Sequence, residues 1–155
     1  MTISHATINI TSMKSSKKPD YRLVDHTADL GIMVRGEDLK DLFENAALSL
    51  IHIIMGKIPE GKGESLQVDI QGEDMVDLMV NWLSEILYLF EGEKKILNWV
   101  EITSLSSKNI SAMLQLIPYD ERAFDIQCEI KAVTYHQLKI SKNNKHWQAT
   151  IIFDV

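Results

Sequence analysis

Residues 72–90 read GEDMVDLMVNWLSEILYLF, and this stretch does most to decide the fold. Gly72-Glu73-Asp74 forms an acidic cap in front of a predicted helix, where negative charge is favourable beside the positive helix N-terminus. The polar residues of the helix fall on one narrow stripe: Asp77, Asn81, Glu85 and Tyr88. A helix with so narrow a polar stripe is mostly buried. We therefore predict core positions, rather than a cofactor pocket, for Met75, Met79, Trp82, Leu83, Ile86 and Phe90.

An earlier helix is predicted to begin after Asp38, which is a good N-cap residue, and to end before Gly56. Pro59 prevents any continuation of this helix. Apolar residues recur along the segment at the three- and four-residue spacing of a helix with one buried face. They are Leu39, Leu42, Phe43, Ala46, Ala47, Leu50 and Ile54.

Most of the remaining sequence predicts β-strands, because apolar residues alternate with polar ones over short runs. The predicted strands are residues 30–34, 66–70, 99–104, 110–116, 126–136, 138–140 and 147–153, with a hairpin turn at Asn143-Asn144. Strand, helix, strand, helix and then a run of antiparallel strands is typical of an α+β fold. We expect a single domain in which two helices pack on one face of a mostly antiparallel β-sheet.

Composition limits the classes of function. Residues 1–20 are predicted to be a flexible polar tail, and residues 21–155 to form the domain, without internal repeats. Lys and Arg number 16 against 22 Asp and Glu, and the resulting net charge of −6 disfavours a main role in gripping a phosphate backbone. Cys128 is the only cysteine, which excludes a disulfide framework and a multi-cysteine zinc site. No secretory signal or membrane span is evident, so we expect a soluble cytoplasmic protein.

Two acidic segments are candidates for a metal site. In Asp25-His26-Thr27-Ala28-Asp29, two carboxylates and an imidazole precede a predicted strand. This segment is either a turn whose carboxylates cap backbone N–H groups or a site for a hard cation. Near the other end of the sequence, strand alternation points Asp154 away from the apolar face of its strand, as it does Asp29. The carboxylates of Asp154 and Val155 repel one another, and a cation shared with Asp29 would relieve this repulsion; the alternative is a frayed, solvated end.

The third candidate segment is residues 129–136, in which Lys131 lies within an otherwise apolar predicted strand. Alternation predicts that Lys131, Val133 and Tyr135 face one way, and that Ile130, Ala132 and Thr134 face the other. Such a lysine is either a guard against edge-to-edge aggregation or a contact for a phosphate or a partner's carboxylate. The sequence contains no P-loop, dinucleotide glycine fingerprint, GxSxG or HExxH, so no catalytic motif accompanies these residues.

Six short segments become specific when their order and spacing are considered together. They are Asp25-His26-Thr27-Ala28-Asp29-Leu30-Gly31, Leu42-Phe43-Glu44-Asn45-Ala46-Ala47, Gly72-Glu73-Asp74, Glu85-Ile86-Leu87-Tyr88-Leu89, Ile130-Lys131-Ala132-Val133-Thr134-Tyr135-His136 and Phe153-Asp154-Val155. In these segments the chain resembles the archease family from Tyr21 to Val155. One departure lies at residues 116–124, LIPYDERAF, where archeases commonly carry Gly-Glu and a histidine.

The resemblance implies a protein that is not itself an enzyme. Archeases activate a GTP- and manganese-dependent RNA ligase, which joins tRNA halves in tRNA splicing and repairs other broken RNA ends. They help this ligase to become guanylylated on its active-site histidine and to sustain multiple turnovers. By this resemblance the chain has the ligase as its partner, and it meets tRNA only indirectly through the ligase.

Carried over residue by residue, the resemblance places the family's metal site on Asp29, Asp154 and Val155, the last through a terminal or backbone oxygen. It implies one divalent cation, with calcium preferred and magnesium or manganese as alternatives. Lys131 is the candidate for a residue needed in activation, and Asp25 and His26 are expected to neighbour the site. The alternative function is a general protein chaperone or assembly factor with a structural metal. A metal-dependent hydrolase ranks behind both, because no general base or nucleophile is evident near these residues.

Overall fold

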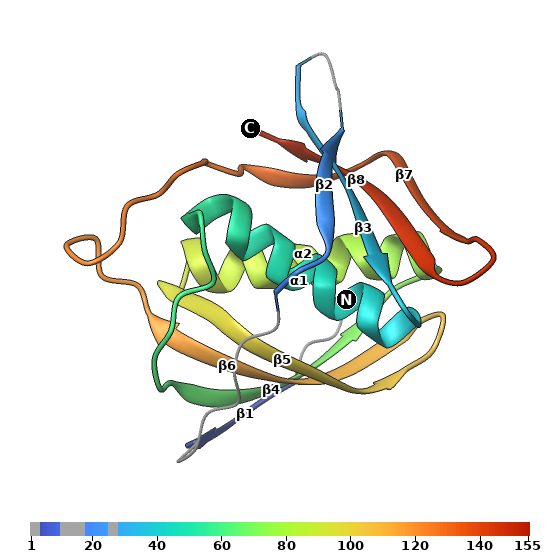
Figure 1. Ribbon diagram of the computed structural model, residues 1–155. Helices are drawn as coiled ribbons and strands as arrows, with labels where there is room; N and C mark the ends of the chain where they lie inside the picture. Colours follow the sequence, from blue (N-terminus) through green and yellow to red (C-terminus); the bar gives the residue numbers. More distant parts are fainter. Residues whose placement is uncertain (1–3, 10–17, 25–27) are drawn as a thin grey trace.

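Two helices form the middle layer of the fold, and an antiparallel sheet covers them on each side in the computed structural model (Figure 1). The structure describes residues 4–9, 18–24 and 28–155. Within these residues, α1 spans Leu39–Met55 and α2 spans Met75–Glu91. The helix α1 packs against strands of both sheets, β3 and β5, and α2 packs against β7 and β5. The apolar core is therefore shared by three layers.

Each sheet has four strands in the described part of the chain, and every neighbouring pair is antiparallel. The first sheet has the order β1-β4-β6-β5, with bounds Ser4–Asn9, Glu64–Gln71, Asn109–Pro118 and Lys95–Leu105. The second sheet has the order β2-β3-β8-β7, with bounds Tyr21–Val24, Leu30–Gly36, Trp147–Asp154 and Ala132–Lys142.

The α+β class and the two helices packed against antiparallel strands are confirmed. The sequence did not indicate that the strands divide into two sheets. Trp82 is fully buried and donates a hydrogen bond from Nε1 to the carbonyl oxygen of Phe43, 2.9 Å away, which joins α2 to α1. Glu85 departs from the expected polar stripe, because it is only 4% exposed. A helix that lies between two sheets has less solvated surface than one that lies on a single sheet.

The two strand-to-helix junctions have the same construction. The sequence Gly-Glu-Asp-x-x-Asp-Leu occurs at residues 36–42, between β3 and α1, and again at residues 72–78, between β4 and α2. In each copy the N-cap aspartate accepts a hydrogen bond of 2.8 Å from the backbone N–H of the next aspartate, Asp38 from Asp41 and Asp74 from Asp77. The likeness of the two junctions is a local cap motif of seven positions, which is shorter than a repeated structural unit.

The glycine of each junction is required by close packing of the backbone. A Cβ atom on Gly36 would lie 2.3 Å from the backbone nitrogen of Leu42, and a Cβ atom on Gly72 would lie 2.6 Å from that of Leu78. Real Cβ atoms do not approach other atoms so closely, so a side chain at either position would push the strand away from the first turn of its helix.

Two predictions about strands are wrong. Residues 4–9 of the expected flexible tail form β1, which pairs with the edge of β4. Pairing uses the backbone, so a short segment without a long apolar run is able to form an edge strand. The strand predicted from residue 126 begins at Ala132 instead. The backbone N–H of Gln127 donates to the carbonyl oxygen of Ile54 at 2.7 Å, which holds residues before Ala132 against the end of α1 rather than in the sheet.

Candidate metal centre

The register of the second sheet ends one residue short of Asp29 and Asp154. Leu30 at the start of β3 pairs with Phe153 of β8. Asp29 directly precedes Leu30, in a bend outside β3, and Asp154 directly follows Phe153, so continuing the register by one step would bring the two aspartates opposite one another. Opposed residues on antiparallel strands have Cβ atoms roughly 4.5–5.5 Å apart and side chains on the same face. The strand alternation seen in the sequence is therefore consistent with the observed register.

Lys131 and Val155 lie at the same end of this sheet. Ala132 of β7 pairs with Asp154, and the backbone N–H of Lys131 donates a hydrogen bond of 2.7 Å to the carbonyl oxygen of Asp154. Regular pairing begins at Ala132 and Asp154, and Val155, which directly follows Asp154, is 42% exposed. Residues from three distant parts of the sequence thus meet at one corner of the molecule, where the C-terminus lies in Figure 1.

The side chains at this corner have the type of donor atom that a hard cation prefers, but they are few. Carboxylate oxygens are the ligands that Ca²⁺, Mg²⁺ and Mn²⁺ prefer. Among the described residues, no group of three or more His, Cys, Asp or Glu side chains is arranged to hold a metal ion. Asp29 and Asp154 therefore require further oxygen donors, and the backbone oxygen of Val155, which directly follows Asp154, is one candidate. Asp25 and His26, expected as neighbours of the site, lie outside the described residues.

Alternation does not hold throughout the segment around Lys131. Ile130 and Val133 are both buried, with exposed fractions of 2% and 9%, whereas Lys131 and Ala132 are exposed. The prediction that Ile130 and Ala132 share a face is wrong, because regular pairing starts only at Ala132. Lys131 borders a groove of about 430 Å³ between the start of β7 and the second half of α2, which Tyr88 and Glu91 also line. A cationic side chain at this place is accessible to a partner.

A hydrogen bond between β7 and α2, which was not predicted, lies further along the same strand. The Tyr135 hydroxyl donates to Oδ1 of Asp77, and the two residues are 58 positions apart. This hydrogen bond, with a smaller contribution from the backbone N–H of Glu73, lowers the pKa of Asp77 below its ordinary value of 3.8. The same bond raises the pKa of Tyr135 above 10.0. Tyr135 lies in the part of β7, between Thr134 and Lys139, where pairing with β8 is interrupted. The hydrogen bond therefore attaches the strand to α2 at this interruption.

The atypical segment at residues 116–124 has a structural role. Tyr119 packs against Phe90 at the end of α2, with ring centroids 5.1 Å apart, and stacks on Phe124 with centroids 6.4 Å apart. Asp120 accepts a hydrogen bond of 2.9 Å from the backbone N–H of Arg122, which closes the turn between these rings. The segment thus leads the chain from the first sheet across the helix layer toward Lys131.

The fold and this corner define a small α+β protein that presents paired carboxylates and a lysine at one end of a sheet. Neither helix in the described part of the chain has the length and apolarity needed to span a membrane. The model of the archease protein family (MTH1598/TM1083) matches residues 21–155. The chain belongs to the archease family.

Individual relatives agree with this assignment. The chain is 32% identical over 145 residues to the protein archease of Methanosarcina barkeri, in an alignment that covers 91% of this chain and 99% of the relative. It is 33% identical over 135 residues to the protein archease of Archaeoglobus fulgidus, with coverage of 87% and 98%. The solution structure of Methanobacterium thermoautotrophicum protein 1598 superposes with a TM-score of 0.68 at 25% identity, covering 87% of this chain and 98% of that one.

Proposed function

We propose that this protein is a non-catalytic activator of a GTP- and manganese-dependent RNA ligase, and that it promotes guanylylation and multiple turnover of this ligase in tRNA splicing and RNA repair. Membership of the archease family supports the proposal at the level of the family. The observation that carries it for this chain is the meeting of Asp29, Asp154, Val155 and Lys131 at one exposed corner.

The carboxylate pair at this corner holds one divalent cation in the proposed mechanism, with calcium preferred. The bound ion supplies positive charge at a place where the protein's own carboxylates otherwise repel one another. The sheet holds the backbone of Asp154, and Asp29 directly precedes the first paired residue of β3. Lys131 lies beside them and contacts an acidic or phosphate group of the ligase complex. In phosphoryl-type chemistry such positioning and charge are the main contributions that an accessory protein is able to make.

A general chaperone function is less well supported. A protein that binds unfolded clients presents a contiguous apolar surface, which monomeric proteins otherwise avoid. Five large apolar side chains are exposed among the described residues, and each comes from a different strand, helix or connecting segment: Leu23, Tyr88, Ile126, Tyr135 and Val155. This is a small number of side chains for such a surface.

The test is a reconstituted ligation assay with a limiting amount of the cognate ligase, an excess of broken tRNA, GTP and manganese. We expect wild-type protein to raise the number of turnovers per ligase. Asp154→Asn should reduce this stimulation at least about tenfold, because the cation loses a charged ligand. Asp125→Asn is the matched control, since it removes the same charge from an exposed residue outside the corner, and it should stimulate like wild type.

Thermal unfolding of each variant shows whether the fold is intact. No stimulation by correctly folded wild-type protein contradicts the activator function itself. Full stimulation by Asp154→Asn contradicts the metal site and leaves the activator function in place. The two parts of the proposal are therefore tested separately.

A further inference from the structure

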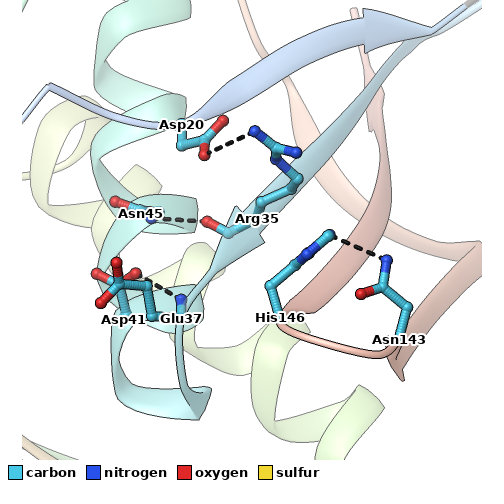
Figure 2. A network of polar contacts seen from close by, with 7 residues as sticks. All are labelled: Asp20, Arg35, Glu37, Asp41, Asn45, Asn143 and His146. Atoms are coloured by element: carbon cyan, nitrogen blue, oxygen red, sulfur yellow. Dashed lines mark hydrogen bonds and ion pairs between the residues drawn. The ribbon is translucent and has the colours of Figure 1, made fainter.

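A second polar site lies on the outward face of the second sheet, at the end opposite the carboxylate pair. It is a hollow of about 490 Å³ between β2, β3 and the turn of the β7–β8 hairpin. Its polar lining comprises Asp20, Arg22, Arg35, Asn143, His146 and Gln148. Figure 2 shows Asp20 and Arg35 on one side, and Asn143 and His146 on the hairpin. Arg35 is six positions after Asp29, which is about 20 Å along an extended chain, so the two sites share no residue.

The register places two guanidinium groups over the same part of this face. Arg22 of β2 pairs with Met33 of β3, and Arg35 lies two residues beyond Met33. Diagonal neighbours of this kind are roughly 7–8 Å apart, within reach of long side chains, so both guanidinium groups are able to contact one ligand. Gln148 pairs with Arg35 from β8 and adds a neutral amide to the same row.

The two arginines are only weakly occupied by the protein's own groups. The Arg22 guanidinium donates to the thioether sulfur of Met33 at 3.5 Å, and thioether sulfur is a weak acceptor. The Arg35 guanidinium lies 3.4 Å from the Asp20 carboxylate, and both side chains are 54% exposed. Exposed ion pairs of this kind contribute little net stability. Each guanidinium carries five N–H donors, so most of the donors in this hollow are available to a ligand.

The backbone beneath these side chains is rigid. Asn45 of α1 donates a hydrogen bond from Nδ2 to the carbonyl oxygen of Arg35 at 2.7 Å, as Figure 2 shows. The backbone N–H of Arg35 donates to the carbonyl oxygen of Asp20 at 3.0 Å. On the hairpin, the Asn143 amide lies 3.0 Å from Nε2 of His146. These hydrogen bonds hold the backbone of Arg35 in place without a ligand.

Cationic side chains reach this hollow although the protein is acidic overall. Arg22 and Arg35 line it, whereas Lys142 of the nearby hairpin faces Trp147, with Nζ 5.9 Å from the ring centroid. Asp20 is the only carboxylate among the described residues that line it. We infer that this hollow binds a phosphate oxyanion, held by Arg22 and Arg35 with help from the amides and His146. Guanidinium groups match the geometry and charge of phosphate oxygens, which makes this the expected ligand class.

The phosphate comes either from a small anion or from the backbone of a nucleic acid strand, and two titrations of the full-length protein distinguish these sources. In the first, inorganic phosphate is added and the backbone amide resonances of residues around the hollow are followed by NMR. In the second, a fluorescently labelled single-stranded RNA of ten nucleotides is titrated, and its anisotropy is measured without divalent metal. Binding of RNA that falls steeply with salt, together with weak binding of phosphate, assigns the site to a strand. Comparable binding of phosphate assigns it to a small anion.

Variants test the residues. Arg22→Gln with Arg35→Gln should weaken binding of whichever probe binds by at least about tenfold, because two charged hydrogen-bonding groups are lost. Asp20→Asn should strengthen it by about twofold, because the carboxylate that competes for Arg35 is neutralised. The control is Lys62→Gln with Lys108→Gln, which removes the same charge from exposed residues beside the first sheet and should change binding less than twofold.

Three results overturn the inference. They are absence of binding of both probes to folded wild-type protein, equal weakening in the arginine and lysine double variants, and weaker binding in Asp20→Asn. The inference does not depend on the proposed ligase activation, since these titrations contain no ligase and no metal.

Discussion

At the scale of single residues, Tyr135 shows how one side chain secures an irregular strand. The sheet pairing of β7 breaks between Thr134 and Lys139, and Gln137 within this break has a φ of 53°. Tyr135 is 57% exposed, yet its hydroxyl donates to Asp77 at the start of α2. Asp77 also accepts from the backbone N–H of Glu73 at 2.8 Å. The Asp77 carboxylate therefore stabilises both the N-terminus of α2 and the neighbouring strand β7.

Replacing Tyr135 with phenylalanine should lower the unfolding midpoint by less than about 2 °C, since the bond is exposed to solvent. The lowered pKa of Asp77 gives stability that is present above 3.8 and is lost as the pH falls through the lowered value. The raised pKa of Tyr135 gives stability that is present below 10.0 and is lost as the pH rises through the raised value. The difference between wild type and Tyr135→Phe should therefore be largest between these limits and shrink outside them.

Differential scanning calorimetry across this pH range measures that difference. Tyr88→Phe is the matched control, because Tyr88 is 54% exposed and its hydroxyl makes no hydrogen bond within the described part of the chain. A difference for Tyr135→Phe that is the same at pH 2 as at neutral pH would contradict the assignment of the bond to the ionised carboxylate.

The residues of the candidate site were predictable to different degrees. Alternation alone turns Asp29 and Asp154 away from the apolar faces of their strands, and continuing the register by one step would bring them opposite one another. The same rule is wrong for Ile130 and Ala132, because alternation applies only where a strand is regular. The bond between Tyr135 and Asp77 and the pairing of Arg22 with Met33 depend on which elements meet in space. Sequence periodicity does not predict such contacts between elements that are distant in the sequence.

At the scale of elements, the repeated Gly-Glu-Asp junctions connect sequence to fold most directly. Each aspartate N-cap satisfies a backbone N–H that the helix itself leaves without a partner. The third residue of each helix accepts in return from the residue before the cap, Asp41 from Glu37 and Asp77 from Glu73. This reciprocal arrangement resembles a capping box. Each glycine then allows the strand to approach the first helical turn.

Asp38→Ala should lower the free energy of unfolding by about 1 kcal/mol, because the backbone N–H of Asp41 loses its acceptor at the start of α1. Asp38→Asn should restore most of the loss, since an asparagine side chain also accepts this hydrogen bond. Urea denaturation followed by circular dichroism measures both. Equal destabilisation by alanine and asparagine would show that the charge of Asp38, rather than its cap, stabilises the helix.

Element boundaries were predictable where a local signal exists and not elsewhere. The helices begin after Asp38 and Asp74 and end at Gly56 and Gly92, because caps and C-terminal glycines act on their immediate neighbours. Gly56 has a φ of 79°, the left-handed conformation that glycine adopts readily at a helix end. The strand β1 lacks such a signal, because its partner is an edge of β4 formed far away in the sequence. The start of β7 is likewise set by contact with α1.

At the scale of the whole molecule, the division of the strands into two sheets gives the second sheet an outward face with two distinct ends. Its inward face packs on the helices and contributes Ile32, Val34, Ala149, Ile151 and Phe153 to the core. One end of the sheet carries Asp29 and Asp154, and the outward face carries Arg22 and Arg35 toward the other end. The overall charge of −6 conceals this separation, because it averages over both ends. The same average led to the expectation that gripping a phosphate backbone is not the chain's main role.

The position of the carboxylate pair also predicts how the protein responds to loss of metal. Asp154 and Val155 are exposed at the end of β8, whereas the core of both sheets and both helices is closed without them. A ligand present at about 100 times its dissociation constant stabilises a protein by about 2.7 kcal/mol, which corresponds to roughly 5–10 °C for a chain of this size. Chelation should therefore lower the unfolding midpoint by no more than this amount and leave the circular dichroism at 25 °C unchanged.

Calcium titration and chelation followed by thermal unfolding measure this response, with Asp154→Asn as the variant that should show no metal-dependent change. A protein whose metal is structural would instead lose its secondary structure on chelation at 25 °C, as small metal-dependent domains do. That outcome would favour the alternative of an assembly factor with a structural metal. A midpoint that moves with calcium in wild type but not in Asp154→Asn, on an unchanged fold, would mean that the ion serves the exposed corner rather than the core.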